Sequence, residues 1–456
     1  MNYKTIFISI FEGVEAKNIL RTPVLATLLA KKDIRIVLFT KSEERVKYYQ
    51  NEFNDSRILY EVVARKPMKG FDVFFAKLKF TLLRTKTTDL KRKMAYDVHK
   101  NPATYYGGLI VNRIFARPLI RKIVRKLDLV LVKDSTYDKY FEKYKPDLVF
   151  LAHLFDEPEI DLLRASKKFG VKSVGFVNSW DKVTARCIIR LLPDKFVVFN
   201  DIVKSELVRH DDVNESTIYV SGLPQYDSYS KPNISDKGEF FKKIGFDESI
   251  KKALVYAPNG RYSNSVDGGM IGLLYSHLES GVFGRDVGII VRFQPNDFID
   301  ESALIKKKSL VYQIPGIRFS GERGVDWDMN SKDINLLVNV LYHSSVFVCY
   351  TSSLSVDAAV FDKPIINIKF ELSRTQKQDN ASTIYYKMDH YKNVIDTGGI
   401  RVVESKDELV SWINRYLSDP NLDNKGRSLL VREQCGVIDG KAGERIGNFI
   451  LKQLNG

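Results

Sequence analysis

Residues Val346 to Ile368 read VFVCYTSSLSVDAAVFDKPIINI, and this stretch decides the expected fold. Its first apolar run, Val346–Cys349, predicts a buried strand, and Ser355–Phe361 predicts the first turns of a helix. Free backbone N–H groups and the helix dipole favour an anion at such a strand-to-helix turn. Hydroxyls in the turn would add donors, although they are also common as simple helix caps. The hydroxyl residues of this turn are Thr351, Ser352 and Ser353.

The rest of the chain repeats the alternation of strand and helix. Short β-rich runs such as KTIFISIF, IRIVLFT and DLVFLAHLF occur in the first half, and KALVYAP and VGIIVRFQP occur in the second. This alternation predicts parallel sheets covered by helices on both faces. A cluster of Pro, Asn, Ser and Asp over Asp227–Phe240 marks a boundary. We therefore expect an α/β protein of two Rossmann-like domains, 1–230 and 240–456, with ligands beyond the carboxyl ends of the strands.

Composition narrows the class of protein. The chain has 456 residues, of which 44% are hydrophobic, and this suits two globular domains. Its three cysteines, Cys187, Cys349 and Cys435, are scattered, which favours a reducing compartment over a disulfide framework. The short apolar run before Glu12 is no secretory signal, and no run is long enough to cross a membrane. We expect a cytoplasmic protein.

The net charge of +15 is concentrated in one segment. Residues 65–126 contain 17 lysines and arginines against three aspartates, interleaved with aromatic and aliphatic residues. Basic amphipathic helices of this kind are attracted to anionic lipid surfaces, by about 1 kcal/mol per cation. A nucleic-acid patch and a solvated basic face are the alternatives, but no nucleic-acid motif accompanies the charge. We expect the segment to place the protein on the inner face of the cell membrane, with four cations in contact: Arg121, Lys122, Arg125 and Lys126.

Candidate catalytic residues follow two strands of the first domain. FEGVEAKN, residues 11–18, follows the first strand and offers Glu15 or its neighbour Glu12. AHLFDEPE, residues 152–159, follows a later strand and offers His153, Asp156 and Glu157. A general base must reach the acceptor hydroxyl and have a suitable pKa, and strand-end position is the only evidence here. A histidine beside an apolar run is more often a packed, hydrogen-bonded residue. Trp180 and Asp181 are further candidates for the same edge, or for packing.

Several ordered motifs carry a family resemblance. DAAVFDKP, residues 357–364, resembles the EAxxxGxP signature of the donor domain of GT-B glycosyltransferases, with Asp357 for Glu and Asp362 for Gly. LVYAPNGR, VRFQPND and CGVIDGKAGERI complete a pattern similar to bacterial CDP-glycerol glycerophosphotransferase-like and surface-carbohydrate transferases. The likeness runs from about Phe176 to the C-terminus. Gln294 occupies a position where relatives often carry histidine.

The resemblance implies a GT-B-like fold and a transferase. Such an enzyme takes a glycosyl or polyol-phosphate group from a nucleotide-sugar or CDP-polyol donor to a polysaccharide or glycolipid acceptor. The nucleotide-activated donor is a substrate, so no separate cofactor is expected. Arg261 follows a strand and a Pro-Asn-Gly turn and is placed to bind a diphosphate. Arg292 lies within a strand and is a second donor-binding candidate, together with the turn 351–353 and Asp357, which is placed to accept from a ribose hydroxyl.

No metal site is predicted. DWD, residues 326–328, has the DxD spacing by which GT-A transferases hold a divalent ion, but it lies in a loop before a predicted helix. Asp333 near the start of that helix suits a cap, and the six histidines show no metal-binding pairing. Two other functions remain open: a UDP-sugar 2-epimerase of the same fold, and a non-catalytic basic adaptor that binds lipid or nucleic acid.

Overall fold

The computed structural model describes residues 3–64, 67–260, 263–295, 304, 307–320, 326–372 and 384–455. The chain forms two compact units, each built on its own sheet. Unit 1 comprises Met1–Asp227 and Gly436–Gly456, and unit 2 comprises Ser228–Cys435. The prediction of two Rossmann-like α/β domains is confirmed. The C-terminal residues, expected in the second domain, instead return to the first.

Unit 1 has a seven-stranded sheet in the order β3-β2-β1-β4-β5-β6-β7, with every neighbouring pair parallel. Because all the strands are parallel, the loops after β1 and β4 leave the sheet at the same edge. The strand order reverses between these two neighbouring strands, and α/β sheets commonly bind ligands at such a point. The strands are β1 (Lys4–Ser9), β2 (Ile34–Thr40), β3 (Ile58–Val62), β4 (Leu148–Leu151), β5 (Lys172–Phe176), β6 (Lys195–Val198) and β7 (Ile218–Val220).

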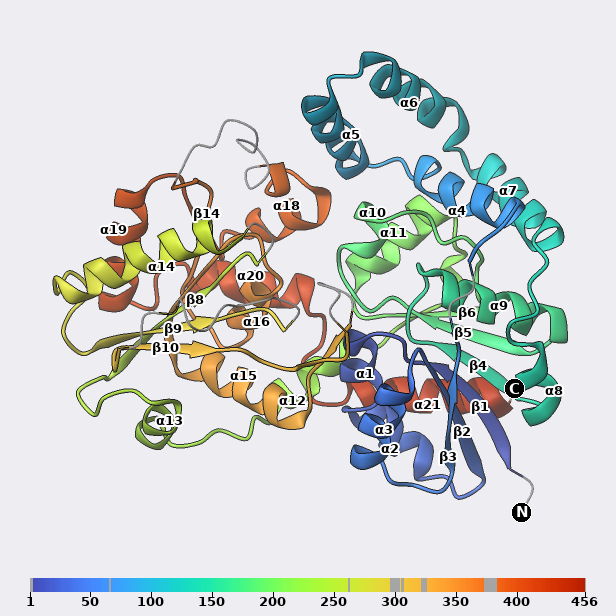
Figure 1. Cartoon of the computed structure of the whole chain (residues 1–456), viewed down its shortest axis with the longest axis horizontal. Coiled ribbons are helices and arrows are strands. Elements are labelled where there is room, and N and C mark those ends of the chain that lie inside the picture. Colours follow the sequence, from blue (N-terminus) through green and yellow to red (C-terminus); the bar gives the residue numbers. More distant parts are fainter. Residues whose placement is uncertain are drawn as a thin grey trace. The chain divides into compact units, whose positions relative to one another are not determined.

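Helices cover both faces of this sheet (Figure 1). The helices of unit 1 are α1 (Gly13–Ile19), α2 (Pro23–Leu29), α3 (Glu43–Glu52), α4 (Phe71–Thr81), α5 (Lys86–His99), α6 (Pro102–Phe115), α7 (Pro118–Leu131), α8 (Asp138–Tyr144), α9 (Glu157–Phe169), α10 (Lys182–Ala185), α11 (Asp201–Asp211) and α21 (Ala442–Asn455), with short 3-10 turns at Glu215–Thr217 and Pro224–Tyr226.

The last helix explains why the C-terminus belongs to unit 1. α21 packs along α2 and against β4 and β5, and Figure 1 shows it in red beside the blue first helices. A Cβ at Gly443 would lie 2.9 Å from Pro23, and a Cβ at Gly447 would lie 2.6 Å from Thr27. The two helices therefore pack so closely that neither position has room for a side chain. Asp227 accepts hydrogen bonds from the N–H groups of Ala442 and Gly443, which fixes the start of α21. Small residues in a distant helix therefore complete the first unit.

A buried guanidinium joins three helices of unit 1. Arg190, which is 3% exposed, pairs with Asp72 of α4 at 2.6 Å, Asp128 of α7 at 2.5 Å and Glu157 of α9 at 2.6 Å. Lys79 of α4 adds a second cation 2.7 Å from Glu157. Burial opposes its charge, but the hydrogen bond and the attraction from Asp128 hold the pKa of Arg190 above its ordinary value. This network ties α4 and α7 to the body of the unit.

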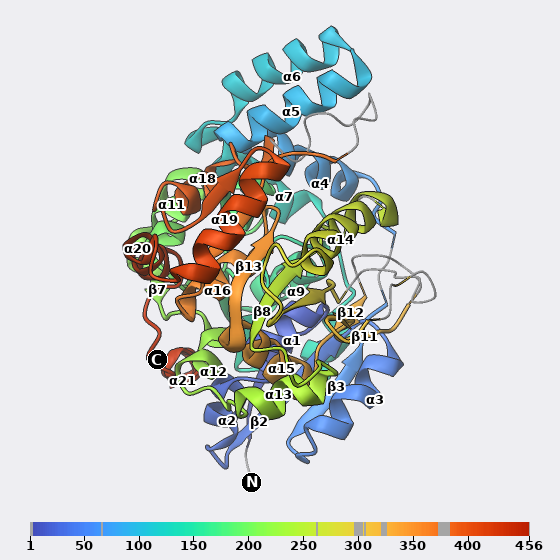
Figure 2. The same cartoon turned by 90° about the vertical axis from the view of Figure 1, so that its left-hand side faces the viewer.

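The basic segment forms helices α4 to α7, in which α5 and α6 make a helical hairpin (Figures 1 and 2). The buried side of α7 is charged, because Arg121 pairs with Asp212 at 2.6 Å and Arg125 pairs with Asp211 at 3.0 Å. The expected membrane contacts of Arg121 and Arg125 are therefore wrong, whereas Lys122 and Lys126 are exposed. Large apolar side chains occupy exposed positions of α4, α6 and α7: Phe71, Phe74, Phe80, Tyr106, Ile110, Val111, Ile114, Phe115, Leu119, Ile123, Leu127, Leu129, Val130 and Leu131.

Unit 2 has a six-stranded parallel sheet in the order β10-β9-β8-β13-β14-β15. In Figure 2, α14 and α19 lie in front of β8 and β13, and buried apolar residues of these helices and strands share one core cluster. The strands are β8 (Lys252–Ala257), β9 (Val287–Arg292), β10 (Leu310–Gln313), β13 (Ser344–Cys349), β14 (Ile365–Ile368), β15 (Arg401–Val403), and a separate antiparallel pair, β11 (Ile317–Arg318) and β12 (Trp327–Asp328). The helices are α12 (Asp227–Ser230, which spans the boundary), α13 (Lys237–Ile244), α14 (Ser263–Glu279), α15 (Ser331–His343), α16 (Leu354–Val360), α18 (Asp389–Ile395), α19 (Lys406–Ser418) and α20 (Asn424–Gln434).

The stretch 346–368 forms β13, a turn, α16 and β14, as its pattern predicts. Asp362, which replaces the usual glycine, has φ of 51°. Glycine and short polar residues adopt this left-handed backbone most readily. The Asp362 carboxylate also accepts from Nε of the fully buried Arg427 at 2.6 Å, and the other nitrogens of Arg427 donate to Leu422 and Pro420 carbonyls. The departure at 362 thus fixes α20 against the end of α16.

Within the part of the chain that the structure describes, no helix is both long enough and apolar enough to span a bilayer.

Removing the Arg190 side chain tests the buried network. We expect Arg190→Leu to lower the free energy of unfolding by about 3–5 kcal/mol, because Asp128 and Glu157 would stay buried with fewer cations. Arg209→Leu, at an exposed position of α11, is the matched control and should cost less than about 1 kcal/mol. Calorimetric unfolding of both variants measures this. Equal melting temperatures would show that the network contributes nothing to the stability of unit 1.

Candidate functional site

Two strand-end loops of unit 1 bring acidic residues together. Glu12 and Glu15 follow β1, and Asp156 and Glu159 follow β4, which pairs with β1 in the sheet. Their charges act on one another, because Asp156 raises the pKa of Glu12 and Glu15 raises the pKa of Glu159. Lys182, at the start of α10 after β5, opposes this effect at Glu12. The carboxyl edge of the sheet therefore carries a cluster of titratable groups, which we call the β1–β4 cluster.

His153 and Asp156 form a pair within the β1–β4 cluster. His153 Nε2 lies 2.9 Å from Asp156 Oδ2, and Arg186 pairs with the other carboxylate oxygen of Asp156. Burial lowers the pKa of His153 to about 4, so its imidazole is neutral at pH 7. Burial raises the pKa of Asp156, but the hydrogen bond and charge of His153 and the charge of Arg186 outweigh it and leave the pKa below its ordinary value. A carboxylate beside an imidazole is the arrangement that orients a general base.

Glu15 has a structural role that its sequence position did not reveal. Its Oε2 accepts from the N–H groups of Phe11 at 2.6 Å and Glu12 at 3.1 Å, so it caps α1. Burial and the neighbouring Glu12 raise its pKa to about 8. Glu12 itself is only half-buried, and its pKa is raised by burial and by Asp156. Of the two, Glu12 is the carboxylate that reaches solvent.

Glu157 has different partners from His153 and Asp156. Its two oxygens bind Lys79 and Arg190, so its carboxylate is occupied by the buried network under α4. Glu159 is not among the predicted site residues. It is 1% exposed, and neither of its carboxylate oxygens is hydrogen-bonded to another described residue. Burial and then Glu15 hold its pKa well above the ordinary value. Glu159 lies in the first turn of the same helix as Glu157, two residues later, and this position could have identified it as a candidate.

Asn178 connects the loop after β5 to the same edge. Its Nδ2 donates to the carbonyl of Ala152 at 3.0 Å, which fixes the chain just before His153. Asp181 accepts from the Ser179 hydroxyl and directly precedes α10. Lys182 and Arg186, on or next to that helix, are the cations that act on the β1–β4 cluster. The segments that follow β1, β4 and β5, three neighbouring strands of the sheet, thus contribute to one site.

In unit 2, Arg292 is a buried cation at the carboxyl end of β9. It is 3% exposed, and its Nη1 donates to Oε1 of Gln313 at 2.8 Å. Within the described part of unit 2 it forms no ion pair with a carboxylate. Burial lowers its pKa to about 10, and the charge of Asp333 opposes that shift. A buried guanidinium held by a neutral amide is suited to an anionic ligand. Arg261, its expected companion, lies outside the described residues.

The turn before α16 is already partly bonded. The Ser352 N–H donates to the Tyr391 hydroxyl at 3.3 Å, and the Ser352 hydroxyl accepts from the Leu354 N–H at 3.2 Å. Ser353 is the N-cap but makes no side-chain cap bond, and Thr351 is half-buried. α16 has seven residues, so its dipole is short. The hydroxyls of Thr351, Ser352 and Ser353 each keep a proton that can be donated to a ligand of this turn.

Two further positions of the donor motifs have defined surroundings. Asp357 is 3% exposed, and burial raises the pKa of Tyr229, with the charge of Asp357 raising it further. Gln294, at the position where relatives often carry histidine, donates to the Asn259 carbonyl at 3.1 Å. It therefore joins the loops after β8 and β9. These loops lie at the carboxyl edge of the sheet, where parallel α/β sheets bind ligands.

The DWD sequence does not lie wholly in a loop as expected, because two of its three residues form a strand. Trp327 and Asp328 form β12, and Asp328 Oδ1 accepts from the Met329 N–H at 2.6 Å. Asp333 forms a capping box with Asn330, as expected. No group of three His, Cys, Asp or Glu residues among those described is arranged to hold a metal ion.

A family profile described as CDP-Glycerol:Poly(glycerophosphate) glycerophosphotransferase matches residues 177–452. This range covers more than half of the chain and contains all of unit 2. The chain belongs to this family. The predicted resemblance to the glycerophosphotransferases is confirmed, and with it the prediction of a transferase that uses a nucleotide-activated donor. No curated protein matches the chain.

Solved structures show the same fold at low sequence identity. A variant of the wall teichoic acid polymerase TagF with CDPG has a TM-score of 0.53 and 13% identity, covering 99% of this chain and 89% of that one. The UDP-GlcNAc 2-epimerase of Neisseria meningitidis with UDP-GlcNAc has a TM-score of 0.56 and 10% identity, covering 98% and 100%. MnaA of S. aureus with UDP has a TM-score of 0.54 and 13% identity, covering 99% and 97%. The GT-B-like fold class is confirmed.

Glu15 should make stability depend on pH. Its pKa is 4.5 ordinarily and about 8 in the folded protein, so between these values the folded state keeps a proton that the unfolded chain releases. Stability therefore falls as pH rises through this window, by up to about 1.4 kcal/mol per pH unit. Glu15→Gln keeps an acceptor for the Phe11 N–H and removes this titration.

Thermal unfolding of wild type and Glu15→Gln from pH 5 to pH 9 measures the effect. We expect similar melting temperatures at pH 5 and a more stable variant at pH 9. Glu142→Gln, at an exposed position of α8, is the control and should follow wild type throughout. Parallel curves for Glu15→Gln and wild type would show that Glu15 does not bind this proton.

Proposed function

We propose that this protein transfers a polyol-phosphate group from a CDP-activated donor to a cell-surface polymer or glycolipid. The family match over residues 177–452 carries the proposal, because it spans the whole of unit 2 and names glycerophosphate transfer. We assign donor binding to unit 2, through Arg292, Asp357 and the turn 351–353. Arg261 belongs to the same proposed set by its motif. Acceptor activation is assigned to unit 1.

The reaction requires two contributions from the protein. The acceptor hydroxyl oxygen attacks the phosphorus that carries the polyol, the bond from that phosphorus to the bridging oxygen breaks, and CMP leaves. A base accepts the hydroxyl proton, and cations balance the charge that develops on the phosphates. We propose that the base comes from the β1–β4 cluster, where Asp156 is ionised, His153 is neutral and Glu12 reaches solvent. Glu15 and Glu157 support this site through the helix cap and the buried network.

Sugar transfer and 2-epimerisation are the other reactions that this fold supports. The epimerases share the fold with 10–13% identity, and this likeness carries no argument about the reaction. The family match favours polyol-phosphate transfer over both. A donor with cytosine is therefore expected, and the transfer is proposed to need no metal ion.

We also propose that the enzyme works at the inner face of the cell membrane. Helices α4, α6 and α7 expose apolar side chains that a soluble surface would normally bury, and these lie among lysines and arginines. Such helices partition into the interface of anionic bilayers. A membrane position suits an acceptor attached to lipid. Binding of nucleic acid is not part of the proposal.

Nucleotide binding tests the donor assignment. We expect CDP or CMP to raise the melting temperature by several degrees at about 100 times its dissociation constant, because a ligand of the native state stabilises it by about 2.7 kcal/mol. UDP, GDP and ADP should act more weakly, and EDTA should change nothing. Asp357→Asn should reduce the shift, while Asp396→Asn, at an exposed position of α18's C-terminal end, should leave it unchanged. A larger response to UDP than to CDP would overturn the proposed donor.

Vesicle binding tests the membrane assignment. We expect Lys122→Gln combined with Lys126→Gln to weaken sedimentation with phosphatidylglycerol vesicles about tenfold or more, since each cation near the surface contributes about 1 kcal/mol. Lys31→Gln with Lys32→Gln removes the same charge from an exposed loop and serves as the control. Equal binding by all three proteins would exclude α7 as the docking helix.

A further inference from the structure

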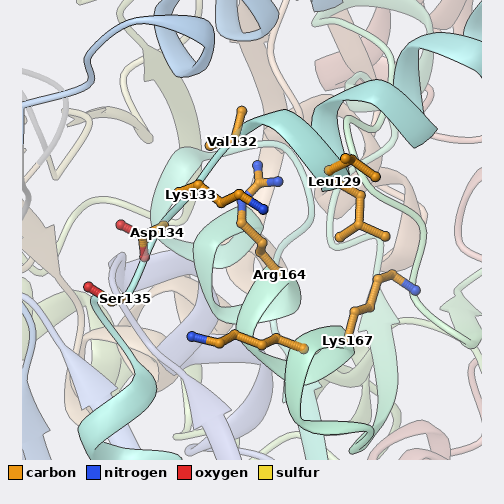
Figure 3. Close-up of a pocket in the computed structure, with 9 residues that line it drawn as sticks. Leu129, Val132, Lys133, Asp134, Ser135, Arg164 and Lys167 are labelled. Carbon is orange, nitrogen blue, oxygen red and sulfur yellow. The ribbon is translucent and has the colours of Figure 1, made fainter.

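A pocket of about 530 Å³ lies between the C-terminal end of α7 and the helix α9 (Figure 3). Leu129 and Val130 of α7 form one part of its lining, and Lys133, just after α7, forms another. Arg164 and Lys167 line it from α9, and Figure 3 shows the Arg164 side chain reaching up between Lys133 and Leu129. The pocket is remote in sequence from every motif used above for the donor. It combines an apolar wall with basic side chains.

Two of the basic side chains that line this pocket are not paired with carboxylates of the described residues. Lys133 is exposed and Lys167 is half-buried, and in the described ranges neither has an ion-pair partner. Lys168, a further lining residue, pairs with Asp138. Asp134 is the acidic residue of the lining, but its two oxygens accept from the N–H and hydroxyl of Thr136 at 2.9 Å each. The pocket therefore attracts an anion.

Arg164 adds a largely buried cation to the lining of the pocket. It is 4% exposed, its Nη1 donates to the Asp128 carbonyl at 2.9 Å, and its Nη2 donates to Asp128 Oδ1 at 2.8 Å. Its Nε, however, has no hydrogen-bond partner among the described residues. A buried charged donor without a partner costs free energy unless something else accepts from it. This nitrogen is enclosed by protein atoms, so Arg164 contributes positive charge beside the pocket and no direct hydrogen bond to an occupant.

The apolar wall shows what kind of anion fits. Leu129 is 39% exposed and Val130 is 61% exposed, and they continue the run of exposed apolar residues along α7. A free phosphate would gain nothing from this wall, whereas an amphiphile with an acyl chain would cover it. The pocket sits at the end of the helix that is proposed to dock on the membrane. Its occupant therefore has a phosphate and an apolar part.

We propose that this pocket binds the phosphate headgroup of a single anionic phospholipid, with Lys133 and Lys167 on the phosphate and Leu129 and Val130 along the start of the acyl chains. The inference rests on the proposed membrane position of the enzyme. It adds a binding site for one lipid molecule to the general attraction of the membrane surface. The exposed lysines of α7 attract any anionic surface, while the pocket holds one lipid and sets the height of α7 in the interface.

A water-soluble lipid separates the pocket from the surface. Dihexanoylphosphatidylglycerol, kept below its micelle concentration, presents single molecules and no bilayer. We expect it to raise the melting temperature of wild type by about 2 °C or more near saturation. Lys133→Gln with Lys167→Gln should lose this shift. Lys122→Gln with Lys126→Gln should keep this shift while weakening vesicle binding, so the second pair separates attraction to the surface from binding of a single lipid.

The controls identify what the pocket recognises. Glycerol 1-phosphate, which has the headgroup but no acyl chain, should give no shift, and an equal shift would overturn a lipid ligand in favour of free phosphate. A shift in Lys133→Gln with Lys167→Gln as large as that of wild type would show that these lysines do not bind the headgroup, and it would overturn the proposal. A response to a short single-stranded RNA, with none to the lipid, would also overturn the proposal.

The outcome for the pocket is distinguishable from the outcome for the proposed function. Failure of wild type to bind phosphatidylglycerol vesicles, with an intact response to CDP, would overturn both the membrane position and the lipid pocket but leave the transferase. A lipid response without any nucleotide response would support the pocket and overturn the proposed donor.

Discussion

The pairing of Arg190 with Asp72, Asp128 and Glu157 is the constraint on which much of unit 1 depends. Helices α4 and α7 expose many apolar residues, and a small buried cluster takes up part of the rest through Leu78, Ile120 and Val124. Buried ion pairs add to this packing: Arg190 at the centre, and Arg121 and Arg125 with Asp212 and Asp211. The arginines of α7 face inward to their carboxylate partners, while its exposed face carries apolar side chains together with lysines. A helix of this kind suits an environment in which its outer face meets lipid.

The same burial of charge shapes the candidate active site. Glu15 and Glu159 are almost fully buried near Asp156, and burial raises the pKa of both glutamates. Asp156 remains ionised because His153 and Arg186 stabilise its charge. Groups with pKa values moved apart by their surroundings are common where acid–base chemistry occurs. The β1–β4 cluster therefore combines structural carboxyls that keep their protons with a carboxylate that does not.

The two units differ in how they relate to known proteins. The family profile begins at residue 177, so it contains unit 2 but not the strands β1 to β4. The donor motifs thus belong to the shared part of the chain, while the β1–β4 cluster and helices α4 to α7 precede it. The residues that we assign to the acceptor and to the membrane therefore lie outside the range that the family profile matches.

The sequence by itself determined the fold class, the strand–turn–helix at 346–368, and the basic apolar character of residues 65–126, because these depend on local periodicity and composition. It did not determine which charges face solvent. Arg121 and Lys122 are neighbours in the chain, yet the first is buried against Asp212 and the second is exposed. Likewise Glu157 and Asp156 are adjacent, but only Asp156 pairs with His153. The return of α21 to unit 1 was equally hidden, since it rests on Gly443 and Gly447 meeting α2. Pairing and burial arise between residues far apart in sequence, so only the tertiary structure decided them.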